Sequence, residues 1–366
     1  MSNYGGRCNY SVFYGAQHKS WWKNFRIRKA QADDISMSSN NNGKNGKSKG
    51  FDAAWEDVAK TIAGKNFIGL QVSCPICRRR GTITSKWVKK TPVKPVYICH
   101  NNGNGYFKAC ELTEEQAKAA RKKTTLSRDD VKKLLRMGKP YILFSGGKDS
   151  LCLLEYMRRL AGSIGKEIVA LHGDTTAGFP EMEEYVKKVC KKLKVPLVTV
   201  RPQHDYFEIA KKWGIPGVRS RWCCETLKVA PMRRYLSTVE EPKVIFDGIR
   251  AVESNIRATY IPVWYHPAFK CISVSPLFRW SDLKVERYIE KCGLPKSPAA
   301  DLNTSAECWC GAYKCKADFE ALLDIHPEIF DKLVEVEKAQ RGKYTFLFEK
   351  GERIPLASLK RKERRN

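Results

Sequence analysis

The stretch Tyr141-Ile142-Leu143-Phe144-Ser145-Gly146-Gly147-Lys148-Asp149-Ser150 decides the fold of this chain. It starts as a short apolar run, passes through two glycines, and leads into residues 151–157, where apolar side chains recur at helical spacing. An apolar run, a glycine turn and an amphipathic helix are typical of a strand that feeds a helix across a phosphate-binding loop. The segment therefore predicts an anion site at a strand–helix junction.

The residue types of the glycine turn, residues 145–150, suit a phosphate. Glycines let the backbone approach an anion closely and adopt positive φ, and the amides and dipole of a helix start attract negative charge. Lys148 adds a cation, Ser145 and Ser150 add hydroxyl donors, and Asp149 can hold a Mg²⁺ bound to phosphate. The spacing between the glycines and the lysine is too short for the Walker pattern.

Strand and helix patterns alternate on the C-terminal side of this turn. The expected strands are 141–144, 168–171, 197–200, 244–246 and 272–274. The expected helices are 151–160, 181–194, 205–213, 226–236 and 282–292. Such alternation predicts an α/β fold, a parallel sheet with helices on both faces, in which ligands bind beyond the carboxyl ends of the strands.

Composition limits the class of protein. The 366 residues carry a net charge of +28, which favours polyanions, with nucleic acid as the first candidate partner. A generally basic proteome or a solubility effect is the alternative. Apolar runs of membrane-spanning length and a secretory signal are both absent from the sequence, so we expect a cytoplasmic protein without a membrane partner.

The N-terminal half divides into three predicted regions. Residues 1–50 are a basic, aromatic stretch followed by a linker rich in Ser, Asn, Gly and Lys. Its aromatic residues among cations could stack on bases, or they could form one face of a packed helix. Residues 51–112 are expected to form a zinc-ribbon-like module, and residues 113–138, rich in helix-forming side chains, a helical connector.

The zinc prediction depends on four thiols. Cys74 and Cys77 have the spacing of a metal knuckle, and Cys99 and Cys110 follow as a wider second pair. His100 is a substitute fourth ligand. A redox pair or structural thiols are the alternatives to Zn²⁺.

Fourteen cysteines are many for an intracellular protein, and clustered ones indicate metal ligands or catalytic thiols. A second cluster lies in the C-terminal half. Its members are Cys223, Cys224, Cys308, Cys310 and Cys315. The isolated residues Cys8, Cys152, Cys190, Cys271 and Cys292 are better explained by core packing.

Further motifs follow the glycine turn in a characteristic order. They are Gly173-Asp174-Thr175, Arg221-Trp222-Cys223-Cys224 with Lys228, Gly248-Ile249-Arg250 with Arg257, and Cys308-Trp309-Cys310 with Cys315. Over about residues 139–317 this order and spacing resemble the phosphoadenosine-phosphosulfate (PAPS) reductase family of the PP-loop ATP pyrophosphatases. The resemblance implies an adenine nucleotide alpha hydrolase-like domain at 139–300, followed at 301–366 by a cysteine-cluster and helical region with a basic tail.

The resemblance also implies residue roles. Residues 145–150 would hold the phosphates of ATP with Mg²⁺, and Asp174 would contact ribose or a metal. Lys228, Arg250 and Arg257 would contact phosphate or sulfonucleotide groups, where cations offset developing charge. The candidate catalytic residues are Lys148, Asp149, Cys223 and Arg250, and a surface ion pair is the alternative for Arg250.

In cluster-bearing adenylyl-sulfate reductases, a double cysteine and a later Cys-x-x-Cys pair hold a [4Fe–4S] cluster. The later group here is Cys-x-Cys-x4-Cys, so five thiols are available for four positions. The preferred set is Cys224, Cys308, Cys310 and Cys315, which leaves Cys223 as a spare ligand or a reactive thiol. Zinc and buried structural cysteines are the alternatives.

Two departures from the reductases decide between activities. The sulfonucleotide-reducing members usually carry an altered PP-loop, whereas this chain keeps Lys148 and Asp149, and it has no cysteine after Cys315 to attack a sulfonucleotide. In both respects the chain resembles the ATP-binding component of DNA phosphorothioation systems and the iron–sulfur tRNA thiolases. The expected function is therefore an ATP-dependent sulfurtransferase that adenylates DNA or tRNA, supplied by a sulfur donor such as a cysteine desulfurase. A PAPS or adenylyl-sulfate reductase with an electron donor is the first alternative, and a non-catalytic nucleic-acid-binding protein is the second.

Overall fold

A computed structural model describes part of the chain. The described residues are 81–88, 91–100, 107–111, 113, 115, 125–218, 220–254, 257, 260, 262–266, 268–298, 308–349 and 351–360. Up to residue 111 only the backbone is described. The chain divides into two units, Met1–Phe51 and Asp52–Asn366, and all described residues belong to the second. The predicted basic N-terminal region and the Cys74–Cys77 knuckle lie outside the described residues.

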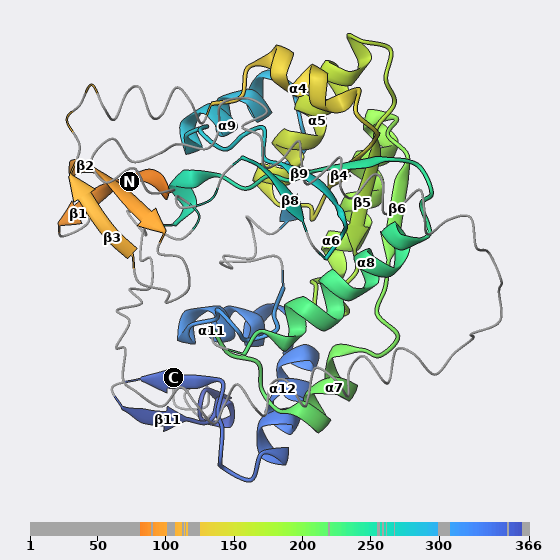
Figure 1. Cartoon of the computed structure of the whole chain (residues 1–366). Coiled ribbons are helices and arrows are strands. Elements are labelled where there is room, and N and C mark those ends of the chain that lie inside the picture. The colour runs from red at the N-terminus through yellow and green to blue at the C-terminus, as the bar shows by residue number, and fades with distance from the viewer. Residues whose placement is uncertain are drawn as a thin grey trace. The chain divides into compact units, whose positions relative to one another are not determined.

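A six-stranded sheet forms the centre of the described C-terminal half, with strand order β6-β5-β4-β7-β9-β8 (Figure 1). Five strands run parallel and β8 pairs antiparallel with β9 at one edge. Their bounds are β4 Lys139–Leu143, β5 Val169–Gly173, β6 Leu197–Val200, β7 Lys243–Phe246, β8 Val263–His266 and β9 Cys271–Val274. The predicted α/β fold with a mainly parallel sheet is confirmed.

Helices connect successive strands. They are α4 Arg128–Leu135, α5 Lys148–Gly162, α6 Pro180–Leu193, α7 Tyr206–Trp213, α8 Ala230–Ser237, α9 Asp282–Lys291, α11 Lys316–Ile325 and α12 Pro327–Ala339. Short helical turns lie at η1 Cys224–Val229, η2 Ala251–Glu253 and η4 Leu356–Ser358. The predicted helix 226–236 starts as the π-helical turn η1 and continues as α8.

Alternate side chains of the strands enter apolar layers on opposite faces of the sheet. Ile142 of β4 packs in one buried cluster with residues of α5 and α6, while its neighbour Tyr141 belongs to another with Leu236 of α8. Successive residues of a strand point to opposite faces, so both faces of this sheet are covered, as parallel sheets require. The apolar face of α5 also meets α9, where Tyr156 packs edge-on against Tyr288 at 6.2 Å between ring centroids. Tyr156 also packs edge-on against Trp280, just before α9, at 5.3 Å.

The strand order places the topological switch point between β4 and β7. From β4 the chain proceeds to β5 and β6 on one side, and then returns to β7 and β9 on the other. A crevice forms outside the carboxyl ends of strands at such a point, and ligands of open α/β sheets bind there. The glycine turn follows β4 and Asp247 follows β7, so both lie at this position.

A separate three-stranded antiparallel sheet is formed by β1 Gly81–Val88, β2 Thr91–His100 and β3 Phe107–Glu111. Its register puts Cys99 opposite Lys108 and Cys110 opposite Tyr97. The predicted zinc site also needs Cys74 and Cys77, which are not described, so it stays a prediction.

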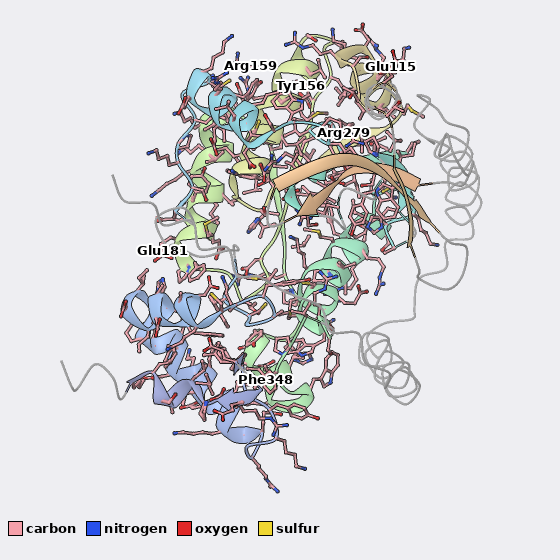
Figure 2. All side chains as sticks on the ribbon, turned by 90° about the vertical axis from the view of Figure 1, so that its left-hand side faces the viewer. Glu115, Tyr156, Arg159, Glu181, Arg279 and Phe348 are labelled. Carbon is pink, nitrogen blue, oxygen red and sulfur yellow. The ribbon has the colours of Figure 1, made fainter. Side chains whose placement is uncertain are left out.

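The C-terminal region joins α11 and α12 to a hairpin, β10 Leu347–Glu349 with β11 Glu352–Ile354. The buried carboxylate of Glu337 on α12 accepts the N–H groups of Phe346 and Leu356 at 3.0 and 2.7 Å, which fixes this hairpin to the helix. Phe348 at its tip is exposed (Figure 2). Among the described helices we find none with the length and apolar character that a membrane crossing needs.

Candidate nucleotide site and thiol centre

The glycine turn has the geometry of an anion loop. Gly147 is the N-cap of α5, which begins at Lys148, so the first amides of the helix lack intrahelical partners. Gly146 has φ of +91°, and a Cβ there would lie 2.6 Å from the terminal carbon of Met182. The Ser145 and Ser150 hydroxyls lie 3.1 Å apart on opposite sides of the turn. Only glycine fits position 146, and the loop backbone is held by the residues around it.

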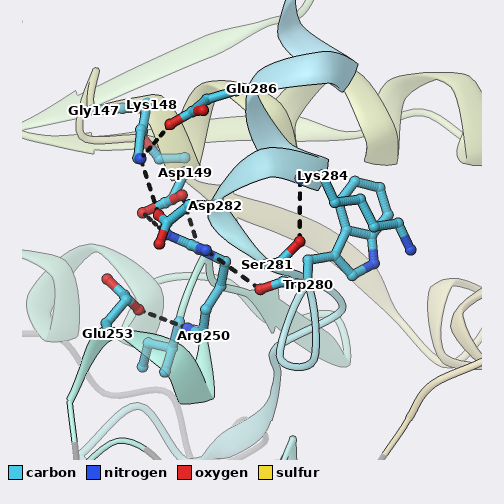
Figure 3. Close-up of polar contacts among 12 residues, drawn as sticks. Gly147, Lys148, Asp149, Arg250, Glu253, Trp280, Ser281, Asp282, Lys284 and Glu286 are labelled. Atoms are coloured by element: carbon cyan, nitrogen blue, oxygen red, sulfur yellow. Dashed lines mark hydrogen bonds and ion pairs between the residues drawn. The ribbon is translucent and has the colours of Figure 1, made fainter. Parts of the chain in front are cut away.

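Lys148 contacts two carboxylates of α9 (Figure 3). Its Nζ lies 3.0 Å from Asp282 Oδ1 and 3.2 Å from Glu286 Oε1, and all three side chains are about half exposed. Partial burial acts to lower the pKa of Lys148, but the hydrogen bonds that its ammonium donates to Asp282 and Glu286 outweigh this effect and raise that pKa. The ammonium is therefore charged and held at the start of α5, on the solvent side.

Arg250 is the buried counterpart of Lys148. Its side chain is 2% exposed, and its Nε lies 2.9 Å from Asp149 Oδ1. Its Nη2 donates to Asp149 Oδ2 at 3.2 Å and to Asp282 Oδ1 at 2.8 Å (Figure 3). Nη1 donates to the carbonyl of Trp280 at 3.3 Å. The guanidinium thus joins α5 to the start of α9, and its predicted contact with phosphate stays a prediction.

Asp149, the predicted Mg²⁺ ligand, is partly buried beside this guanidinium. Burial raises the pKa of Asp149, and the attraction of Arg250 only partly offsets that rise. A Cβ at Gly248 would lie 3.2 Å from the carbonyl carbon of Asp149. The loop after β7 therefore packs closely on the backbone at the start of α5, and a side chain at position 248 would require that backbone to shift by a few tenths of an ångström.

Asp247 completes the switch point from β7. It is 7% exposed, and its carboxylate accepts from the hydroxyls of Ser275 at 2.6 Å and Ser273 at 2.9 Å and from the N–H of Ile249 at 3.1 Å. Burial raises the pKa of Asp247, although these three hydrogen bonds act to lower it. The carboxylate fixes the end of β9 and the start of the loop that carries Arg250.

The remaining predicted nucleotide residues lie on neighbouring loops. Asp174 follows β5, pairs with Arg201, which follows β6, and accepts the N–H of Thr176 at 2.9 Å. The Lys228 side chain of η1 lies against Gly173, within 3.6 Å of where a Cβ would be. Arg257 pairs with Glu253, whose other carboxylate oxygen accepts the Arg250 N–H at 2.7 Å. Asp174 and Lys228 thus lie at the end of β5, and Arg257 lies beyond β7.

Three of the five predicted cluster thiols meet. The Cys223 and Cys308 sulfurs each lie 3.6 Å from that of Cys310. Hydrogen bonds from those two thiols lower the pKa of Cys310 to about 3. Cys224 is half-buried next to Cys223, whereas Cys315 caps α11, its thiol accepting the N–H of Asp318. Among the described residues, we find no group of three or more Cys, His, Asp or Glu side chains that is arranged as a preformed metal site.

Aromatic side chains and a main-chain connection surround these thiols. Tyr206 is fully buried and donates from its hydroxyl to the carbonyl of Cys310 at 2.8 Å. Trp309 donates from its backbone N–H to Ala177 at 2.9 Å and from its indole to Gly178 at 2.9 Å. The cysteine segment is therefore bonded to the loop after β5 that begins with Asp174.

A comparison with known families matches residues 139–302 to the phosphoadenosine phosphosulfate reductase domain. This part of the chain is a PAPS reductase domain. It contains the glycine turn, the sheet, α9 and the cysteine pair at 223–224, while Cys308, Cys310 and Cys315 lie beyond the matched residues.

Relatives of the PAPS reductase domain cover only part of this chain. Two uncharacterized proteins of Methanocaldococcus jannaschii are 32% and 28% identical over 178 and 201 residues, 48% and 53% of this chain. The matches span only 36% and 46% of those relatives' own length. An adenosine 5'-phosphosulfate reductase of Bacillus mycoides is 28% identical over 174 residues, 47% of this chain and 70% of that protein.

Among solved structures, a phosphoadenylyl-sulfate reductase from Candida auris is 22% identical, with a TM-score of 0.40 over 54% of this chain and 96% of that one. An FMN adenylyltransferase from Candida glabrata is 15% identical, with a TM-score of 0.37 over 46% of this chain and 54% of that one.

Sequence reasoning missed several residues of the PAPS reductase domain and its surroundings. Asp282 and Glu286 were expected only as part of a helix, yet they bind Lys148. Tyr206 and Lys314 beside the thiols were not singled out. Asp282 and Glu286 share one face of α9 by their i, i+4 spacing, and that acidic face is the signal that sequence offers. Isolated Cys152, Cys190 and Cys271 are buried in the core.

Proposed function

We propose that this chain is an ATP-dependent sulfur-transfer enzyme that adenylates a nucleic acid. The main support is an unaltered Lys148 and Asp149 at the helix start that follows a glycine turn, at the switch point of the sheet. A triphosphate needs a cation for its oxygens and a carboxylate for its Mg²⁺, and these two residues supply both.

In the proposed reaction, an oxygen of the substrate attacks the α-phosphorus of ATP. The new O–P bond replaces the bond between the α-phosphorus and the bridging oxygen, and pyrophosphate leaves. Lys148 and the amides at the start of α5 would offset the charge of the departing phosphates. A donor such as a cysteine desulfurase delivers sulfur as a persulfide, and a thiol reductant, which ends as a disulfide, releases it at the sulfide level. This sulfur then bonds to the activated atom, and AMP leaves with the oxygen.

Arg250 has a positioning role in this proposal. Its guanidinium is buried against Asp149 and Asp282, which fixes the carboxylate that would face Mg²⁺. A buried arginine with two carboxylate partners holds geometry more rigidly than a mobile surface cation.

The thiols suit a metal centre. Zinc–sulfur bonds of about 2.3 Å put tetrahedral thiolates about 3.8 Å apart, close to the 3.6 Å separations at Cys310. Cys223, Cys308 and Cys310, with adjacent Cys224, would hold zinc or an iron–sulfur cluster, which also takes cysteine thiolates. If three of these thiolates held a [4Fe–4S] cluster, its fourth iron would be open to carry a sulfide.

Two features support a nucleic-acid substrate. The chain has a net charge of +28, which favours a polyanion. Near the thiols, the Arg221 guanidinium lies over the ring of Tyr313 at 5.6 Å, and that ring is 42% exposed. An exposed aromatic beside a cation can stack on a base while the cation meets phosphate.

A sulfonucleotide reductase is the second candidate, because a relative named as an adenosine 5'-phosphosulfate reductase matches 47% of this chain. It would reduce adenylyl sulfate or PAPS to sulfite. The intact Lys148 and Asp149 of the glycine turn argue against it, because a sulfonucleotide has no pyrophosphate to be cleaved there.

The two candidates separate in one set of assays on the anaerobically purified full chain. ATP–pyrophosphate exchange is measured with and without RNA or DNA for the wild type, Lys148→Ala and Lys188→Ala, and sulfite release is measured from both sulfonucleotides. We expect the wild type to catalyse ATP–pyrophosphate exchange. Lys148→Ala should lower the exchange rate about 10²-fold or more. Lys188→Ala, which removes an exposed pair with Glu184, should match the wild type. No exchange under any condition contradicts the proposal, and sulfite release establishes the reductase.

A further inference from the structure

Lys314 is a lysine buried almost completely in the segment between two of the clustered cysteines. Its side chain is 4% exposed, and within the described part of the chain its Nζ has no hydrogen-bond partner. Among the described residues, the carboxylate oxygen that pairs with it is Oδ1 of Asp318, at 3.7 Å. The other oxygen of Asp318 already accepts the N–H of Cys315 at 2.8 Å.

A buried ammonium in such a position is unfavourable by itself. Removing a charge from water is costly unless close, well-aligned partners replace the lost hydration. The carboxylate of Asp318 is itself buried and lies beyond hydrogen-bond distance, so it offsets the cost of burying the ammonium only in part. The position of Lys314 therefore implies a further source of negative charge close to its Nζ.

The local backbone places Lys314 in the tight turn that directly follows Cys310. Lys314 closes a turn by donating its N–H to Gly311 at 3.3 Å. Gly311 has φ of +89°, and a Cβ there would lie 2.4 Å from the ring of Phe346. Position 311 therefore requires glycine, and from this turn the Lys314 ammonium acts electrostatically on the Cys308 and Cys310 thiols.

We propose that Lys314 is the charge partner of an anionic metal–thiolate centre built on Cys223, Cys308 and Cys310, an inference that rests on the metal centre of the proposed function. Thiols bind zinc or iron as thiolates and release their protons to solvent, so the loaded centre is anionic. The ammonium then gains a counter-charge closer than the one that Asp318 supplies within the described part of the chain. Lys314 acts through the thiolates and is a positioning residue.

The chain offers a matched control two residues further on. Lys316 pairs with Glu320 at the same i, i+4 spacing and the same 3.7 Å distance as Lys314 with Asp318. The Lys316 side chain is 32% exposed, so it differs from Lys314 mainly in burial. Replacing each lysine by methionine removes one charge and keeps most of the side-chain volume.

The experiment uses the full chain, purified anaerobically and loaded with iron and sulfide or with zinc. Metal content, the rate of metal loss to a chelator and, for the iron form, the midpoint potential are measured for the wild type, Lys314→Met, Lys314→Arg and Lys316→Met. We expect Lys314→Met to lose metal about 10–100-fold faster, as outer-shell changes at metal sites do. Its potential should be more negative, because a cation that favours the reduced centre is gone. Lys314→Arg keeps the positive charge, so its metal retention and midpoint potential should stay close to those of the wild type. Lys316→Met should match the wild type.

Urea unfolding of the metal-free proteins separates this role from plain packing. Without metal, Lys314→Met should be at least as stable as the wild type, because an apolar side chain replaces an incompletely paired buried charge. A metal-free Lys314→Met variant that is clearly less stable overturns the inference. So does a loaded Lys314→Met variant with wild-type metal retention and potential.

Failure of the proposed function is visible separately. A wild type that takes up neither zinc nor iron removes the metal centre and this inference together. ATP–pyrophosphate exchange measured on the same sample still tests the nucleotide chemistry. Exchange without metal uptake would leave adenylation in place while rejecting the role of Lys314, and metal uptake without exchange would do the reverse.

Discussion

Oδ1 of Asp282 accepts a hydrogen bond from Nη2 of Arg250 at 2.8 Å, and the same oxygen accepts from Nζ of Lys148 at 3.0 Å. One carboxylate oxygen thus joins a buried cation to an exposed cation. Asp149 binds the other side of the guanidinium. Positive and negative groups alternate across α5, the loop after β7 and α9, so nucleotide phosphates that reach Lys148 compete with carboxylates of α9.

Arg250→Met should destabilise the protein strongly. The change leaves the partly buried Asp149 without its main counter-charge, and breaking a buried pair from one side costs up to about 3–5 kcal/mol. The free energy of unfolding from urea titration measures this effect. Lys188→Met, which breaks the exposed pair with Glu184, should cost less than about 1 kcal/mol. If the two variants have equal stability, Arg250 does not hold this site together.

Glu286→Gln should tighten ATP binding. Glu286 contacts Lys148 at 3.2 Å on the exposed side, and neutralising it frees the ammonium for phosphate. Exposed ion pairs contribute about 0.2–1 kcal/mol, so we expect the Kd to fall by up to about fivefold. Isothermal titration with Mg-ATP measures it. Glu290→Gln, an exposed change one turn further along α9, is the control, and an equal gain there would show a general charge effect instead.

Gly146→Ala should impair folding and the nucleotide site together. The residue has φ of +91°, and the new Cβ would meet the Met182 side chain at 2.6 Å. We expect a loss of about 1–3 kcal/mol in the free energy of unfolding. Gly162→Ala at the end of α5 has open space around its Cβ and should stabilise by about 0.4–1 kcal/mol. A neutral Gly146→Ala variant would contradict the loop geometry described here.

The buried carboxylate of Asp247 should make stability depend on pH. Burial raises the pKa of Asp247, so the folded protein binds this proton more tightly than the unfolded chain does. Its contribution is fully present below the unfolded pKa of about 3.9 and is lost as the pH rises through the folded pKa. Asp247→Asn should remove this loss. As the pH is raised from acidic to neutral, the urea midpoint of the wild type should therefore fall relative to that of Asp247→Asn. Parallel midpoint curves for the two proteins would show that the pKa of Asp247 is not raised.

The backbone pattern was predictable where local sequence determines it. Expected strands agree with β4, β5, β6, β7 and β9 to within two residues at each end, because parallel strands are buried on both faces and their apolar runs are continuous. The edge strand β8 was not predicted. It is four residues long and pairs on one side only, so its sequence carries little pattern.

The site was only partly predictable because its contacts join distant segments. Arg250 and Asp282 are 32 residues apart, and nothing in the local pattern of either indicates that they pair. Cys315 is a different case, since Asp318 three residues later resembles the capping-box spacing and indicates a helix start. The preferred ligand set of Cys224, Cys308, Cys310 and Cys315 stays a prediction, and in the structure the Cys315 thiol accepts the N–H of Asp318.

The loop after β5 has a length that is fixed from both ends. Asp174 begins it beside Arg201, and Ala177 and Gly178 are bonded to the backbone and indole of Trp309 between two of the clustered cysteines. One extra residue between Asp174 and Gly178 would shift the strip that carries Cys308 and Cys310 away from Cys223. Tolerance to insertion should therefore be lower in this loop than at the exposed hairpin tip near Phe348, although both are short surface connections by sequence.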